Sequence, residues 1–252
     1  MDLFHAGLLF GAGIVGGLIS ALAGGASIVT FPALLAAGLP PVTAVATNVS
    51  AFAPALLLAV FTEREKLPPM NRSFLGLILV SGIGTVMGAA LLLATPERLF
   101  GMLVPLLLAI GTLLLAVSGR VRDWMKKRSG HNKADRRLSA SLILPVSIYS
   151  GYFGAGAGVM LAGVTSLEAE DYRQANAMKN VMTLTTTTAA IIVYAASGTL
   201  DWPATFLLGG GGILGGIAGV RLARIVPQDR MRMIVVVFGV VLTLTYAWRY
   251  WL

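Results

Sequence analysis

The chain has 252 residues, of which 56% are hydrophobic and only 12% are charged. A soluble domain usually carries about twice this proportion of charge, so the composition excludes an ordinary soluble protein. The absence of cysteine excludes disulfides and thiolate metal sites. The net charge of +8 does not indicate nucleic-acid binding, because the basic residues lie in short loops between apolar stretches.

Long apolar stretches follow one another along the chain. A run of about 18 or more apolar residues predicts a membrane-spanning helix. The N-terminal stretch is apolar and lacks the basic segment of a signal peptide, so we interpret it as the first membrane element. An all-α polytopic membrane protein is predicted from six long runs, at 41–61, 73–95, 98–118, 174–197, 202–221 and 229–250.

Two further hydrophobic segments are interrupted by glycine. In the first, residues 4–22 and 28–37 flank the sequence ALAGGAS, and in the second, residues 139–153 and 159–167 flank GAGAG. The shorter piece of each segment would reach only about 15 Å as a helix, which is too short to span. Each segment is therefore either one broken helix or a re-entrant hairpin that returns to the side from which it entered.

The interrupted segments belong to an internal repeat with an offset of 131 to 132 residues. We divide the chain into a first transmembrane repeat at 1–118, a linker at 119–138 and a second transmembrane repeat at 139–252. The repeated GxxxG glycines indicate close helix packing. The matched residues are Gly24 and Gly156, Asn48 and Asn180, Gly84 and Gly215, and Gly88 and Gly219.

Lysine and arginine are unevenly distributed among the loops. Residues 62–72 contain three, the linker eight and residues 221–232 four, whereas 38–41 and 198–202 contain none. Basic loops are expected in the cytoplasm. The three basic loops fall on one side only if both interrupted segments are hairpins. This arrangement places the linker in the cytoplasm and both termini in the periplasm, and it makes the repeats inverted, as in many secondary transporters.

The glycine-rich interruptions predict a central binding site. Backbone polar groups freed at membrane depth need a partner in protein or water. The N-terminus of a half-helix attracts an anion through its free N–H groups and its dipole. Close packing of small residues is the alternative explanation. The candidate residues are Gly24, Gly25, Ala26 and Ser27 in the first repeat and Ala155, Gly156, Ala157 and Gly158 in the second.

Each repeat also places a polar pair at an equivalent point of a predicted span, Thr47-Asn48 in the first and Lys179-Asn180 in the second. An ionisable residue inside a membrane is costly and suggests function, and a lysine would favour an anionic substrate. Asparagine can donate two hydrogen bonds to an oxyanion. The alternative for Lys179 is that it extends to the membrane interface. The middle of every long predicted span lacks aspartate and glutamate, which argues against a cation carrier.

Two stretches carry a family resemblance. GGLISALAGGASIVTFPALLAAGLPPVTAVATNVSA is similar to the first-repeat signature of the sulfite exporter TauE/SafE family, and SGYFGAGAGVMLAG followed by ANAMKN resembles the second-repeat signature. The resemblance implies a bacterial inner-membrane secondary carrier of sulfite, sulfonates, sulfoacetate-like molecules or other organic anions. It also implies that Thr47-Asn48 and Lys179-Asn180 occupy signature positions.

We therefore predict a secondary transporter that exports a small anion by alternating access. A passive anion channel and a membrane scaffold remain as alternatives. The sequence contains no metal-binding motif, nucleophile elbow or phosphate-binding loop, so we predict neither an enzyme nor a cofactor. The expected partners are the small anionic substrate, membrane lipid and a second copy of the chain in a homodimer.

Overall fold

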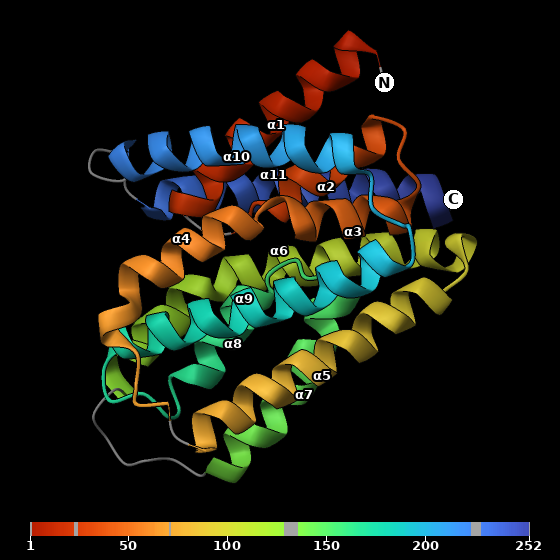
Figure 1. Ribbon diagram of the computed structural model, residues 1–252. Helices are drawn as coiled ribbons and strands as arrows, with labels where there is room; N and C mark the ends of the chain where they lie inside the picture. The colour runs from red at the N-terminus through yellow and green to blue at the C-terminus, as the bar shows by residue number, and fades with distance from the viewer. Residues whose placement is uncertain (1, 23–24, 71, 129–135, 223–227, 252) are drawn as a thin grey trace.

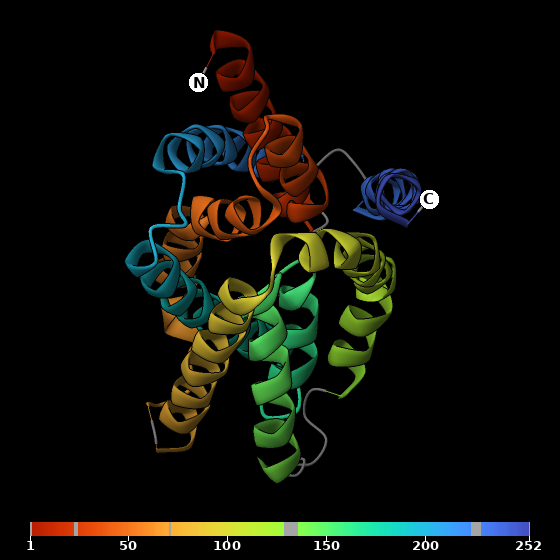
Figure 2. The ribbon, with the colours of Figure 1, turned by 90° about the vertical axis from the view of Figure 1, so that its right-hand side faces the viewer.

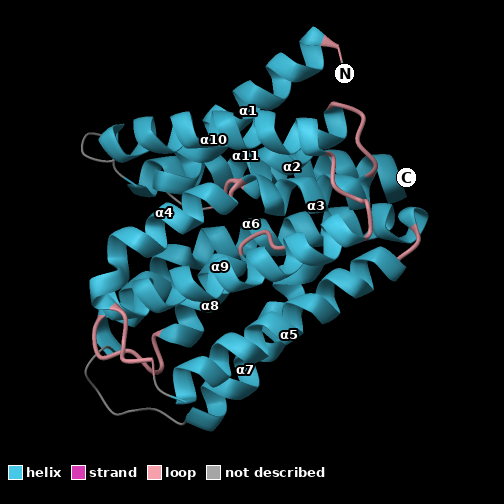
Figure 3. Ribbon diagram, in the orientation of Figure 1, coloured by secondary structure: helices cyan, strands magenta, loops and turns pink. Residues whose placement is uncertain are grey.

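The computed structural model describes residues 2–22, 25–70, 72–128, 136–222 and 228–251, and every regular element among them is helical (Figure 1, Figure 3). The first six helices are α1 (Leu3–Leu22), α2 (Ser27–Ala36), α3 (Pro41–Ala51), α4 (Ala53–Glu63), α5 (Arg72–Ala94) and α6 (Glu97–Arg128). The last five are α7 (Arg136–Tyr152), α8 (Ala157–Thr165), α9 (Tyr172–Ala196), α10 (Trp202–Leu222) and α11 (Gln228–Trp251). A 3-10 turn, η1 (Arg64–Lys66), follows α4.

The predicted all-α polytopic membrane protein is confirmed. Within the described residues, six stretches are long and apolar enough to cross a membrane. They are Leu3–Ala21, Pro41–Lys66, Phe74–Ala94, Glu97–Trp124, Trp202–Leu222 and Arg230–Trp251.

This set differs from the predicted runs at two places. The first piece of the N-terminal interrupted segment is itself long enough to span, as α1. The run predicted at 174–197 does form a helix, the 25-residue α9, but it is not among the six. Its asparagines, threonines and Lys179 lower its mean hydropathy below that of a lipid-facing span. A helix with this composition needs protein or water around its polar face.

Helix α6 is longer than predicted. It continues as one helix of 32 residues to Arg128, so residues 119–128 of the predicted linker are helical. Residues 129–135 of that linker lie outside the described residues. The extension carries the polar end of α6 beyond its apolar run.

Glycine contacts hold the two halves of the chain together. Helix α1 packs along α10, and α7 packs along α5 (Figure 2). A Cβ atom at Gly215 would lie 1.9 Å from the carbonyl oxygen of Ile14, and one at Gly88 would lie 2.0 Å from that of Ile148. The predicted packing role of the GxxxG glycines is therefore confirmed, because their missing side chains let the helix backbones touch.

The chain ends and connections gather at two opposite ends of the bundle. In Figure 1, both termini and the connections α2–α3, α5–α6 and α9–α10 lie at one end, on the right. The connections α4–α5 and α8–α9 lie at the other end. Helix α2 thus returns the chain to the end at which α1 began, and α8 does the same for α7. Each interrupted segment is a hairpin in this structure.

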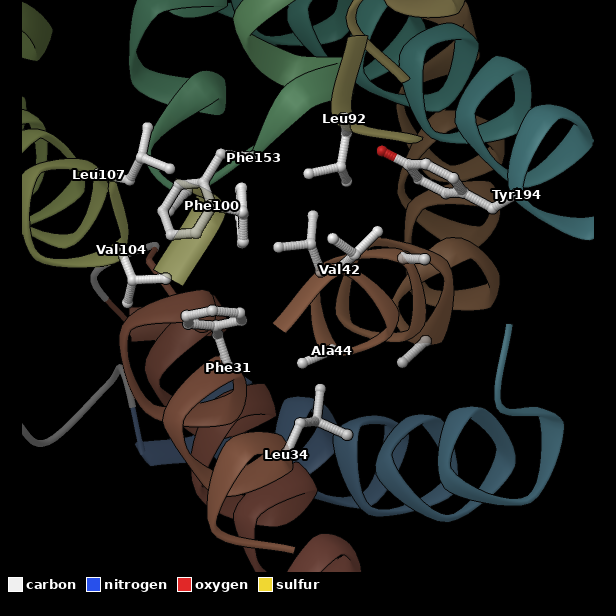
Figure 4. Close-up of a cluster of buried hydrophobic side chains, with 14 of the residues drawn as sticks. Phe31, Leu34, Val42, Ala44, Leu92, Phe100, Val104, Leu107, Phe153 and Tyr194 are labelled. Carbon is white, nitrogen blue, oxygen red and sulfur yellow. The ribbon is translucent and has the colours of Figure 1, made fainter. Parts of the chain in front are cut away.

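A buried apolar cluster fills the bundle near the end that carries both termini. Phe31 of α2 and Phe153 after α7 meet edge to face, with ring centroids 5.3 Å apart. Phe100 lies 6.5 Å from Phe153 by the same measure. Figure 4 shows these rings with neighbouring side chains of α3, α5, α6 and α9: Val42, Ala44, Leu92, Val104 and Tyr194.

Candidate functional site

One face of α9 forms a polar wall. The helix begins cleanly because the Asp171 side chain accepts a hydrogen bond of 2.7 Å from the backbone N–H of Gln174. Residues spaced three or four apart share a helix face. Six side chains of α9 with polar groups line one cavity at this spacing: Tyr172, Asn176, Lys179, Asn180, Thr183 and Thr187.

The N-termini of the two short helices meet the same cavity. Gly25 has φ +85° before α2, and Gly156 has φ +77° before α8, a conformation that favours glycine. A Cβ atom at Gly156 would also lie 2.9 Å from Cβ of Leu114, so a side chain has no room there. The lining includes Gly25, Ala26 and Ser27 of the first tip and Gly156, Ala157 and Gly158 of the second.

The cavity has a volume of about 430 Å³ and lies between the two hairpin tips and α9. Helix α3 contributes Asn48, α6 contributes Ser118 and Arg122, and α11 contributes Arg232. The Arg232 guanidinium lies against Gly119 of α6. A Cβ atom added at Gly119 would stand 2.0 Å from Nη1 of Arg232. Elements from both halves of the chain therefore enclose one polar space of the size that suits a small molecule.

The two repeat-related asparagines are held differently. The Thr30 hydroxyl lies 2.5 Å from Oδ1 of Asn48, which lines the cavity, and 3.0 Å from the carbonyl oxygen of Ala26. The Nδ2 group of Asn180 donates to Oε2 of Glu63 at 2.7 Å. One asparagine is thus oriented by a hydroxyl, and the other by a carboxylate.

Most of the predicted binding residues come together at this cavity. Gly24 lies outside the described residues. Thr47 and Ala155 are buried and are not among the lining residues. Thr47 accepts a hydrogen bond of 3.3 Å from the backbone N–H of Asp201, because adjacent helix positions face different neighbours. Those that line the cavity are Gly25, Ala26, Ser27, Asn48, Gly156, Gly158, Lys179 and Asn180.

Among the residues missed are four with a charged or amide side chain at or beside the cavity. Asn176 stands in the ANAMKN motif and could have been found by its spacing from Lys179. Arg122 and Arg232 were assigned to basic loops, but α6 and α11 carry both to the cavity. Glu63 was assigned to a span end, which is correct, yet its carboxylate reaches Asn176 and Asn180 of α9. The sequence holds no signal for this contact, because it depends on how α4 packs against α9.

The second hairpin tip is secured by a tyrosine. The Tyr149 hydroxyl donates to the carbonyl oxygen of Ala155 at 2.6 Å. We expect Tyr149→Phe to lower the free energy of unfolding by about 1–3 kcal/mol, because a buried carbonyl loses its donor. Denaturant unfolding of the purified protein in detergent measures the change. Tyr152→Phe is the control, since the Tyr152 hydroxyl lies 3.5 Å from the Thr95 hydroxyl and loses little. Equal unfolding curves for both variants would show that this hydrogen bond does not secure the tip.

The fold and the cavity together define a multi-pass membrane protein with a polar, partly basic site enclosed by both halves of the chain. The family model described as sulfite exporter TauE/SafE matches residues 9–246, so the chain belongs to this family. The chain is a membrane transporter, and its relatives are named as probable membrane transporter proteins. Membership of a transporter family is consistent with the absence of an enzymatic role.

Three relatives cover nearly the whole chain. A probable membrane transporter protein of Haemophilus influenzae is 29% identical over 240 residues, which are 94% of this chain and 92% of that protein. The probable membrane transporter protein YfcA of Escherichia coli is 26% identical, with 94% and 87% covered. The probable membrane transporter protein ORF9 of a Sinorhizobium species is 25% identical, with 97% and 95% covered. No solved structure matches the chain.

Proposed function

We propose that the protein is a secondary transporter that exports a small sulfur-containing or organic anion, such as sulfite or a sulfonate, across a bacterial inner membrane. The observation that carries this proposal is the cavity in which Lys179 and Asn48 face the N-termini of α2 and α8. Each of these groups favours negative charge. The family membership and the names of the relatives support transport, and the site chemistry supports an anion.

The cavity offers an anion several kinds of contact. Several N–H groups in the first turns of α2 and α8 already donate to carbonyl oxygens of the preceding turn, among them those of Ile28, Val29 and Val159. The two tips therefore act on an anion chiefly through the positive potential of the helix dipoles. These tips resemble the half-helix ends that hold substrate carboxylates in other transporters. The Lys179 ammonium adds a full charge, and Arg122 and Arg232 line the cavity farther along α6 and α11. A tetrahedral sulfur oxyanion has enough acceptor oxygens to use these donors together.

The proposed orientation is inward-facing. The arginines of the lining and Tyr172 lie near helix ends opposite to the two termini, whereas the apolar cluster of Phe31, Phe100 and Phe153 lies on the other side of the cavity. Basic loops are expected in the cytoplasm, so the end that carries these arginines would face the cytoplasm. The end that carries both termini would face the periplasm. Substrate would enter from the cytoplasm, and the apolar cluster would close the periplasmic exit.

Inverted repeats and alternating access complete the proposal. The first half of the chain begins at the end with the termini, and α7 begins at the opposite end, which supports an inverted relation. Release of the anion requires the apolar cluster to separate while the cytoplasmic side closes. Movement of the two halves relative to each other would achieve both changes around a fixed central site.

A ligand-dependent stability assay tests the anion assignment. A ligand that binds the folded state alone raises the apparent stability, by about 2.7 kcal/mol at a hundredfold excess over Kd. We expect one or a few sulfur anions to raise the unfolding temperature of the purified protein at constant ionic strength. The panel is sulfite, sulfate, taurine, sulfoacetate, methanesulfonate, acetate and chloride. Equal shifts with every anion, or no shift with any, would contradict the proposal.

A further inference from the structure

A carboxylate of the protein itself is hydrogen-bonded to two side chains that line the proposed site. Asn176 Nδ2 lies 2.8 Å from Oε1 and 2.9 Å from Oε2 of Glu63, and Asn180 Nδ2 lies 2.7 Å from Oε2. The same carboxylate interacts electrostatically with Lys179. All three partners stand on the polar wall of α9 that lines the cavity. Glu63 therefore holds the donors and the charge that a substrate anion would use.

A carboxylate and a substrate anion cannot use the same donors at once without cost. Two like charges at close range repel each other strongly where water is scarce. Protonation of Glu63 removes this conflict. It discharges the carboxylate, weakens its hold on Asn180 and Asn176, and supplies an O–H group that can donate to a substrate oxygen.

We propose that Glu63 is the coupling group of the carrier, and that it takes up one proton from water when the substrate anion binds. This inference rests on the anion transport proposed above and adds the ion to which that transport is coupled. The Glu63 carboxylate plus one proton becomes a neutral carboxylic acid, while Lys179 keeps its charge and faces the anion. When the anion leaves on the other side, the proton returns to water. A monovalent anion and a proton that leave together carry no net charge, so the membrane potential does not act on this export. The outward gradient of the anion drives it, and the inward proton gradient opposes it.

Other ionisable groups surround α4. This helix packs against α3, α9, α10 and η1. Helix α3 carries no ionisable side chain. The groups on the other three elements are Tyr172, Arg173, Lys179 and Tyr194 on α9, Arg221 on α10, and Arg64, Glu65 and Lys66 on η1. Glu63 is the one carboxylate among these elements that is hydrogen-bonded to lining residues in the described structure.

Substitution of Glu63 by glutamine tests the proposal. The probe is methanesulfonate, whose charge stays constant from about pH 8 to about pH 5.5, and the readout is its Kd for the purified protein. We expect the wild-type affinity to rise by up to about tenfold for each unit fall in pH, since proton and anion favour each other's binding by the same factor. Glu63→Gln is expected to bind with no pH dependence and about tenfold more tightly than wild type at the alkaline end. Glu65→Gln, an exposed neighbour on η1, should behave as wild type.

A second measurement needs no variant. Addition of methanesulfonate to weakly buffered wild-type protein should raise the pH by the uptake of up to one proton for each anion bound. Binding without proton uptake, or a wild-type pH slope in Glu63→Gln, would overturn the coupling role and leave anion transport standing. A folded Glu63→Gln protein that binds at no pH would also overturn it, because Glu63 would then position the site. Absence of binding to wild type at every pH would count against the sulfonate class itself, and the coupling role would fall with it.

Discussion

Replacement of Lys179 by methionine is expected to weaken binding of the substrate anion by about tenfold to a hundredfold. A hydrogen bond to a charged group contributes about 1.5–3 kcal/mol, and 1.4 kcal/mol corresponds to a factor of ten in Kd. Methionine keeps the length of the side chain and removes its charge, so the polar wall of α9 loses the full positive charge that it carries into the cavity. Titration of the purified protein with the stabilising anion measures the effect.

Lys66→Met is the matched control, because Lys66 is exposed on η1 and does not line the cavity. Both variants lose one positive charge, so a general electrostatic effect would weaken binding equally in both. Equal affinities for wild type and a folded Lys179→Met protein would remove Lys179 from the site. Its side chain would then serve only to reach the membrane interface.

Replacement of Gly215 by alanine is expected to give the largest loss of stability among single-methyl changes. The added Cβ would stand 1.9 Å from the carbonyl oxygen of Ile14 and 2.9 Å from its Cα, so the backbones of α1 and α10 must separate. Overpacking typically costs about 1–3 kcal/mol, and here the obstacle is backbone and not a flexible side chain. Thermal unfolding in detergent, followed by circular dichroism, measures the change.

Gly216 offers a control one residue away. A Cβ atom at Gly216 meets nothing within 4 Å, and alanine is the better helix former by about 1 kcal/mol. Gly216→Ala should therefore unfold at or above the wild-type temperature. If Gly215→Ala were as stable as Gly216→Ala, the close contact of α1 with α10 would be wrong.

The fold could be predicted largely from one-dimensional patterns. Long apolar runs predict spans because a helix must be that long to cross the bilayer. The short pieces beside the glycine-rich breaks left a broken helix or a hairpin open, and the basic loops favoured hairpins. Gly88 and Gly215 were predicted as packing residues because spacing on a helix is local information. The pattern failed at the end of α6, where polar residues after 118 suggested a loop. A helix that leaves the bilayer can continue through polar sequence, and α6 does so to Arg128.

The site could be predicted only where the repeat pointed to it. The two glycine-rich hairpin tips lie at equivalent positions of the two repeats, and so do Asn48 and Asn180. These residues and Lys179 line the cavity, except Ala155 and Gly24, which is not described. Thr47 was included as the repeat partner of Lys179, in the polar pair with Asn48, but its side chain accepts a hydrogen bond from the backbone N–H of Asp201. The Glu63 contact has no counterpart in the second repeat. It arises from the packing of α4 on α9, which single-sequence periodicity does not contain.

Counterflow in proteoliposomes tests most directly whether the protein is a carrier. Vesicles are loaded with an excess of the unlabelled anion, diluted, and given a trace of the same anion with a radioactive label. A carrier that exposes one site alternately to each side accumulates the label transiently, and it saturates with external anion. We expect such an overshoot for the wild type and its loss in Lys179→Met. Entry of label that never exceeds equilibrium and never saturates would contradict alternating access and identify a passive anion channel.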